Sequence, residues 1–487
     1  MRYTSAAGRW VIAATVLGSA MAAIDGTVVG IALPSIGREL HASLGTLQWV
    51  VTGYTLTLAA LLILGGSLGD RFGRRRVFSI GVVWFVLAST ACAVATGPAV
   101  LIATRLLQGV GAALLTPGSL AIIQASFDRE DRGRAIGAWS GLGGVATAAG
   151  PLLGGYLIAA ASWRWIFLIN LPVGVTVLAL TARHVPESRD PDAPPRIDVA
   201  GAALAVVALA GVTFALIEGP AHGWSPPAVL MLAAGVAAGV GFVAVERRTA
   251  VPMVPLAILR VRQFTVTNLV TFVVYASLGG VLFLLPVELQ VVDGYTPLES
   301  GIALLPLTVV MLLLSARSGR LAARIGPRLQ MSVGPVVVGA GLALLARTAT
   351  DRSYASGVLP AVLVFGLGLA ITVAPLTATA LGALPGEHAG LASAVNNDVA
   401  RLGGLIAVAV LPALSGMHGD VYLHPAALAT HFRMAVLIAG SWCALGGLVA
   451  AVGIRNPPPA PVAAPAQEKP EPCFHCALDA APLATEA

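Results

Sequence analysis

The chain has 487 residues, of which 57% are hydrophobic and only 11% are charged. About a quarter of the residues in an ordinary soluble domain are charged, so this composition excludes a water-soluble globule. The formal net charge of +6 does not indicate a nucleic-acid partner, because the positive residues are concentrated in every second segment between long apolar runs. We therefore expect a protein embedded in a lipid bilayer.

Apolar runs of roughly 18 residues or more can cross the hydrocarbon core as helices. We identify fourteen, with ends defined to within a few residues. The first continues past a cleavage-like Ala20-Met21-Ala22, which favours a retained span over a signal peptide. The runs lie at 10–33, 47–68, 77–95, 99–121, 135–161, 165–182, 199–217, 227–245, 266–287, 298–316, 331–346, 358–381, 391–414 and 434–452.

The spans are predicted to form two similar halves. The string "GSLGDRFGRR" from Gly66 resembles "GRLAARIGPR" from Gly319, and "DREDRGRA" from Asp128 resembles "PGEHAGLA" from Pro385. A duplicated six-span unit is typical of secondary transporters, whose substrate site lies between the halves near the membrane midplane. Fourteen spans then leave a two-helix hairpin between the two copies.

We predict four parts: a six-helix bundle at 10–182, a linker with two extra helices at 183–262, a second six-helix bundle at 263–454, and a tail at 455–487. Most of the 29 lysines and arginines fall on the side of the amino terminus, which predicts cytoplasmic termini by the positive-inside rule. The tail is rich in Pro and Ala and is expected to be disordered. Its "CFHC" string, Cys473 to Cys476, is interpreted as incidental in preference to a metal or redox pair.

Five strings in chain order carry a family resemblance: "IDGTVVGIALP" (24–34), "GSLGDRFGRRRV" (66–77), "LIATRLLQGVGAAL" (101–114), "AAGPLLGGYL" (148–157) and "WRWIFLINLPVG" (163–174). They resemble motifs of the major facilitator superfamily, in particular its fourteen-span drug:proton antiporters of the EmrB/QacA type. The resemblance implies an all-α membrane protein with two six-helix bundles, an inserted hairpin and alternating access.

Two charged residues lie within spans, where an ionised side chain is costly unless it faces a cavity or a partner. We predict that Asp25 points into the cavity between the halves, where a proton and a cationic cargo would compete for it. A structural carboxylate bonded to a neighbouring helix is the alternative. Arg105 needs a partner on another helix, and Asp25 is one candidate; the resemblance implies a part in proton transfer, whereas the alternative is that Arg105 only holds two helices together.

The resemblance also assigns roles to two glycine-containing motifs. A conformational latch would comprise Gly66, Asp70, Arg71, Gly73 and Arg74, with Asp70 near the start of the third helix, where the helix dipole favours a carboxylate. Orientation of the protein by the arginines alone is the alternative. A motif associated with antiporters comprises Gly150, Pro151, Gly154 and Gly155.

Other polar and aromatic residues are candidates for lining the cavity: Gln48, Trp49, Tyr54, Asn170 and Glu288. Core packing is the alternative for the aromatic residues, and a water-filled outer mouth is the alternative for Glu288. Asp398 and Arg401 are three residues apart on one span, so they share a helix face and are expected to neutralise each other.

The sequence therefore predicts a monomeric, proton-coupled exporter of amphipathic or cationic drugs or antibiotics in the plasma membrane. Its partners would be protons and the bilayer, without a cofactor, a metal site or nucleic acid. A proton-coupled symporter or facilitator, a membrane-embedded enzyme and a transporter-like sensor are the alternatives. No HExxH or GxxxxGK[ST] string occurs, which disfavours metalloprotease chemistry and ATP-driven pumping.

Overall fold

The structure, a computed structural model, describes residues 1–191, 198–249, 252–347, 353–385 and 389–456. Within these ranges the chain is helical and has no strand, and fourteen helical segments are long and apolar enough to cross a membrane. This number agrees with the sequence prediction. Almost all of the predicted disordered tail, including Cys473 and Cys476, lies outside the described residues.

The first half contains six spans, the last of which is broken at Ile169. Within it, α4 packs against α2 and α3, whereas α1 packs against α5 and α7. Most helices extend beyond the predicted apolar runs, because their polar ends still form hydrogen-bonded turns. The elements are α1 (Ala6–Leu40), α2 (Leu44–Phe72), α3 (Arg74–Ala93), α4 (Pro98–Ser126), α5 (Arg129–Ala160), α6 (Trp165–Leu168) and α7 (Asn170–His184).

The second half repeats this pattern of helix partners. α10 packs against α15 and α16, as α1 packs against α5 and α7, and α14 packs against α12 and α13, as α4 packs against α2 and α3. The tenth span is interrupted at Leu304, close to Pro306, which cannot donate a backbone hydrogen bond. The elements are η1 (Leu256–Arg260), α10 (Arg262–Val291), α11 (Pro297–Ala303), α12 (Leu305–Ile325), α13 (Pro327–Leu345), η2 (Tyr354–Val358), α14 (Leu359–Gly382), α15 (Ala389–Leu414), η4 (Val421–Leu423) and α16 (Pro425–Gly453).

Between the halves, α8 (Val199–Ala221) and α9 (Pro226–Arg248) form a hairpin. The two helices approach so closely at Gly211 that a Cβ atom there would lie 2.5 Å from the Met231 carbonyl oxygen. Small residues permit such contacts in lipid, where helix association depends on close packing. α8 also packs against α2 and α15, so the hairpin contacts both halves.

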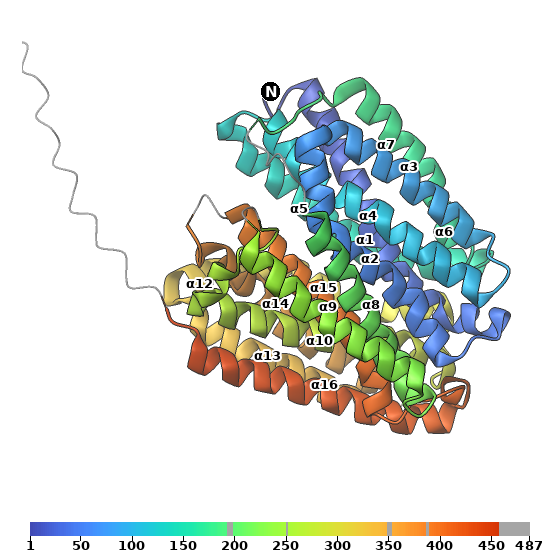
Figure 1. Cartoon of the computed structure of the whole chain (residues 1–487). Coiled ribbons are helices and arrows are strands. Elements are labelled where there is room, and N and C mark those ends of the chain that lie inside the picture. Colours follow the sequence, from blue (N-terminus) through green and yellow to red (C-terminus); the bar gives the residue numbers. More distant parts are fainter. Residues whose placement is uncertain (192–197, 250–251, 348–352, 386–388, 457–487) are drawn as a thin grey trace, which may run out of the picture.

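The two halves meet on one side of the membrane-spanning region. We call the side with the starts of α1 and α10 the terminal side, and the opposite side the far side. Figure 1 shows the halves diverging toward the terminal side. In the described ranges, the hydrogen bonds between the halves lie on the far side: Gln48 Nε2 to the Val408 oxygen (2.7 Å), Leu44 N to the Gly419 oxygen (3.0 Å), Gln290 Nε2 to the Ile31 oxygen (2.9 Å), and the Tyr422 hydroxyl to the Ala42 oxygen.

Tyr422 is a dependable donor in this contact. It lies on η4, between the spans, and its side chain is buried. Burial and, to a smaller extent, the charge of Asp420 raise the pKa of Tyr422. The phenol therefore stays protonated and donates a hydrogen bond to the Ala42 carbonyl oxygen.

Glycines allow α5 and α11 to close the far side. A Cβ atom on Gly155 would lie 2.5 Å from the Pro297 carbonyl oxygen, and one on Gly301 would lie 2.4 Å from the Pro151 carbonyl oxygen. Both obstacles are backbone atoms, which a side-chain rotation cannot move. The contact between α5 and α11 therefore requires glycine at both positions.

We expect Gly155→Ala to separate α5 from α11 and to favour conformations with an open far side. The measurement is the distance between spin labels on the exposed positions Tyr156 and Ile302, in a background without native cysteines. The distribution should shift to longer distances. Gly144→Ala on the same helix is the matched control, because a Cβ atom there meets nothing within 4 Å; equal distributions in the two variants would contradict the role of Gly155.

Candidate functional site

The most buried charges in the first half form an ion pair between α1 and α4. Asp25 and Arg105 are each 1% exposed, and the Arg105 Nη1 donates to the Asp25 Oδ2. Gln108 completes the arrangement: its amide nitrogen donates to the Asp25 Oδ1 at 2.7 Å, and its oxygen accepts from the Arg105 Nη1 at 2.7 Å. We call Asp25, Arg105 and Gln108 the α1–α4 cluster.

Arg105 also ties the cluster to α2. Its Nε donates to the Val50 carbonyl oxygen at 3.0 Å, and its guanidinium carbon lies 4.4 Å from the centre of the Tyr54 ring. The Tyr54 hydroxyl in turn donates to the Ala22 carbonyl oxygen of α1 at 3.0 Å. One arginine side chain therefore connects three helices of the first half.

Asn170 of α7 borders the cluster on another side. Its amide nitrogen donates to the Ser89 hydroxyl at 3.0 Å and lies 3.5 Å from the Asp25 Oδ1. Both oxygens of the Asp25 carboxylate thus have polar partners, as a buried charge requires. Gln108 was not among the predicted residues, although its spacing of three from Arg105 places the two on one helix face.

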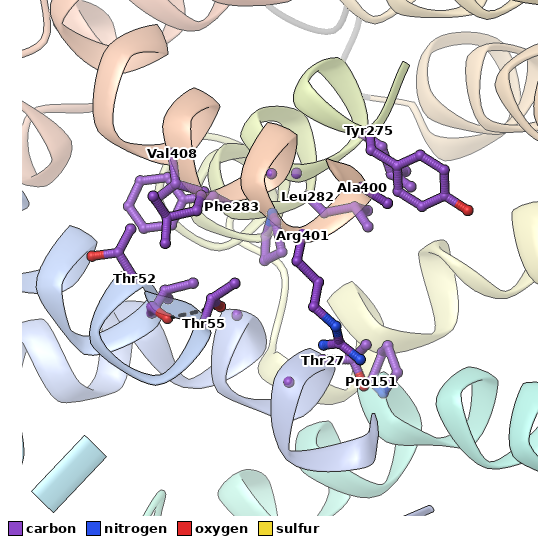
Figure 2. A pocket seen from close by; sticks show the side chains of 18 of the residues that line it. Thr27, Thr52, Thr55, Pro151, Tyr275, Leu282, Phe283, Ala400, Arg401 and Val408 are labelled. Atoms are coloured by element: carbon purple, nitrogen blue, oxygen red, sulfur yellow. Dashed lines mark hydrogen bonds between the residues drawn. The ribbon is translucent and has the colours of Figure 1, made fainter. Parts of the chain in front are cut away.

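A cavity of about 260 Å³ lies between the halves. Residues of α1, α2, α5, α10 and α15 line it, and most of them are apolar. The polar residues among them are Arg401, Thr27, Thr52, Thr55 and Tyr275 (Figure 2). α15 begins at Ala389, so Arg401 is about 18 Å along the helix, near the middle of the membrane-spanning region.

Asp25 is not among the residues that line this cavity, although Gly26 and Thr27 beside it are. The carboxylate faces α4 and α7 instead. The prediction that Asp25 points into the cavity is therefore wrong for this conformation. The physical reason is that Arg105 and Gln108 occupy the hydrogen-bonding positions of the carboxylate.

None of the five residues predicted to line the cavity does so. Gln48 donates to carbonyl oxygens of α15 on the far side, and Trp49 donates to the Glu218 carboxylate of α8 at 3.0 Å. Tyr54 and Asn170 pack around the α1–α4 cluster. Residues of the right type lie on the right helices, but they point toward other neighbours.

Glu288 also differs from its prediction. It is 0% exposed, and neither carboxylate oxygen has a hydrogen-bond partner among the described residues. It therefore lies neither in a water-filled mouth nor in the cavity.

Asp398 and Arg401 interact electrostatically, as their spacing predicts, but the described residues show no hydrogen bond or ion-pair contact between them. In the described residues, the Asp398 Oδ1 and the Arg401 Nε are both buried without a hydrogen-bond partner. Figure 2 shows the Arg401 side chain extending across the cavity toward Thr27 and Pro151 of the first half. The long arginine side chain reaches open space instead of folding back along α15.

The predicted latch residues surround the turn between α2 and α3. Asp70 lies in the last turn of α2, not at the start of α3, because the helix continues to Phe72. Its Oδ1 accepts from the Arg74 Nε at 2.8 Å, across Gly73, whose φ is +114°. Of the remaining two predicted residues, Gly66 faces Pro117 and the Arg71 guanidinium lies 5.3 Å from the Phe72 ring centre.

The segment that follows α7 is bonded to this turn. Arg74 N donates to the Ser188 oxygen at 2.9 Å, Arg75 N donates to the Glu187 carboxylate at 3.0 Å, and Asp190 N donates to the Asp70 oxygen at 3.0 Å. The turn is therefore attached to the start of the linker that leads to the hairpin.

The four residues of the predicted antiporter motif lie where α5 meets α1 and α11. Gly150 faces the Thr27 hydroxyl, and Gly154 faces Val28. Pro151 lines the cavity, and Gly155 contacts the start of α11. The motif therefore links the cavity wall to the closed far side.

Comparison with known proteins agrees with this architecture. The family profile described as Major Facilitator Superfamily matches residues 15–408. The tetracenomycin C resistance and export protein of Streptomyces glaucescens is 37% identical over 412 residues, covering 84% of this chain and 76% of the relative. The multidrug resistance protein Stp of Mycobacterium tuberculosis is 36% identical over 400 residues, covering 82% and 74%. The solved structure of a bacterial homolog of the human lysosomal transporter Spinster has the same fold, with a TM-score of 0.67, 17% identity, and coverage of 94% of this chain and 100% of that one.

We expect Asp25→Asn to destabilise the fold more than the double change Asp25→Asn with Arg105→Gln. The single change leaves a buried arginine without its counter-ion, which costs about 3–5 kcal/mol when one partner of a buried pair is removed. The double change leaves no buried charge. Thermal unfolding in detergent measures the difference, with Asp420→Asn as an exposed control. A double variant less stable than the single variant would contradict this account of the cluster.

Proposed function

Because this chain belongs to the major facilitator superfamily, we propose that it exports small amphipathic molecules from the cell in exchange for protons, by alternating access. The observation that carries the proposal is the buried Asp25–Arg105 pair, which lies beside a cavity between two similar helical bundles. A carboxylate that can gain or lose a proton within the membrane is a natural coupling group. The cavity at mid-depth is where a transporter of this architecture holds its cargo.

Two observations support export of drug-like molecules. The relatives described above carry names that refer to antibiotic or drug resistance, and one is named an export protein. The fourteen candidate spans also fit the drug:proton antiporter branch that the sequence motifs resemble. A mostly apolar cavity with a few hydroxyl groups suits amphipathic cargo.

The distribution of charge supports one orientation of the protein in the membrane. The arginines and lysines concentrated on the terminal side support cytoplasmic termini in the plasma membrane. The far side then faces outward, and the far-side contacts described above correspond to a conformation closed to the outside. A single chain contains both bundles and the cavity, which supports a monomeric transporter.

Coupling would act through helix packing. In the pair, the charges of Asp25 and Arg105 cancel, and Arg105 holds α4 against α1 and α2. A proton on Asp25 removes its negative charge and leaves the buried arginine uncompensated, so the protonated protein favours a different arrangement of these helices. Residues of α1 and α2 line the cavity, and their movement would change the affinity for cargo.

The Asp70 turn is suited to act as a latch on the terminal side. Its present contacts attach α2 and α3 to the linker at Glu187 and Ser188. When the halves approach on the terminal side, Asp70 and the neighbouring arginines would find partners on the second half. The latch would then stabilise the outward-open state without touching the cargo.

Proton-driven export should be lost in Asp25→Asn. The assay uses inverted membrane vesicles with an imposed proton gradient. It measures drug uptake into the vesicles and proton release from them. We expect wild type to show both, and Asp25→Asn to show neither while it still binds drug, because the amide cannot carry a proton. The Asp420→Asn variant, at an exposed position, should behave as wild type. Unchanged gradient-driven uptake in Asp25→Asn would refute the coupling role.

A further inference from the structure

The cavity between the halves contains a positive charge that forms no ion pair with any described residue. Arg401 is the only charged residue among those of the described chain that line this cavity. Its Nε is buried without a hydrogen-bond partner, and the structure shows no ion pair with Asp398, one helical turn away. A guanidinium at mid-membrane depth is costly unless an anion or hydrogen-bond acceptors compensate it.

Among the described residues, Asp398 interacts electrostatically with Arg401 but forms no hydrogen bond or ion pair with it, and the other two carboxylates of the membrane interior lie elsewhere. Asp25 is bound to Arg105 and Gln108 on the other side of α1. Glu288 is buried away from the cavity lining. The cavity therefore offers a cation and no carboxylate to its contents, which is the reverse of the charge expected from the sequence.

The rest of the lining indicates what kind of anion would fit. Phe283, Leu278 and Leu282 give the cavity an apolar wall, and Thr27, close to the Arg401 guanidinium, offers a hydroxyl group (Figure 2). A planar guanidinium binds a carboxylate through two parallel hydrogen bonds, which gives both affinity and orientation. An aromatic molecule with one acidic group would pack against the apolar wall and neutralise the charge of Arg401.

We propose that Arg401 binds the acidic group of the cargo, so that the transporter selects anionic amphipathic molecules such as aromatic carboxylates. The proposal rests on the export function proposed above and specifies its substrate class. Arg401 extends from α15 of the second half toward α1 and α5 of the first. An anion bound there would join groups from both halves, which is what a cargo must do to influence their relative position.

Binding of a matched pair of compounds tests the assignment. The probes are anthraquinone-2-carboxylate and anthraquinone-2-carboxamide, which differ in charge but little in shape, and the purified full chain in nanodiscs is titrated with each by calorimetry. We expect wild type to bind the carboxylate about tenfold more tightly than the carboxamide, as expected for a charge-assisted hydrogen bond.

Variants at Arg401 separate recognition from structure. Arg401→Gln should remove the preference for the carboxylate and leave carboxamide affinity within about twofold, because only the charge-assisted contact is lost. Arg401→Lys should keep part of the preference, since it retains the charge without the planar fork. Arg433→Gln, at an exposed position on α16, is the control and should match wild type.

Equal affinities of wild type for the two probes, or an equal loss of both in Arg401→Gln, would overturn the proposal. Failure of the export function itself is recognised separately, by drug accumulation in cells. If cells expressing wild type retain every compound of a mixed panel of acids, neutral molecules and cations, the export function fails. If they expel neutral molecules and cations but retain acids, export stands and the role of Arg401 is refuted.

Discussion

The arrangement of the first half depends on a single ion pair in the membrane interior. Asp25 and Arg105 are both almost completely buried, and together with Gln108 they join α1 to α4. Arg105 extends this connection to α2 through the Val50 carbonyl oxygen. Either charge alone would be costly at this depth. The three helices therefore keep this arrangement only while the ion pair is intact, and loss of one charge would require them to rearrange.

In the mechanism proposed above, this placement would separate the proton from the cargo. The residues beside Asp25 line the cavity, but the carboxylate itself faces away from it. Proton and cargo therefore need not compete for the same atoms, and their linkage becomes a coupling free energy carried by α1 and α2. Such coupling tolerates cargoes of varied shape, because the proton site does not have to recognise them.

The sequence was sufficient to predict the spans, the duplicated halves and the need of Arg105 for a partner on another helix, because hydropathy and the cost of a buried charge are local properties. It was not sufficient for the cavity lining. Trp49 and Thr52 lie within one turn of α2, yet Trp49 contacts the hairpin and Thr52 faces the cavity. Which face of a helix meets the cavity is decided by neighbouring helices, and that information is not local.

The charge of the cargo affects how the membrane potential drives export. Exchange of one entering proton for one neutral molecule moves a single positive charge inward. If the cargo leaves as a monoanion held by Arg401, the same exchange moves two, because an anion moving out is equivalent to a positive charge moving in. Each charge gains about 2.3 kcal/mol per 100 mV, so an anionic cargo would be exported against a steeper gradient by the same proton. A cationic cargo would cancel the charge of the proton and leave only the pH gradient to drive export. If the proposed exchange holds, a cavity that is lined by Arg401 and by no carboxylate of the described residues would favour the cargo on which the membrane potential acts most strongly.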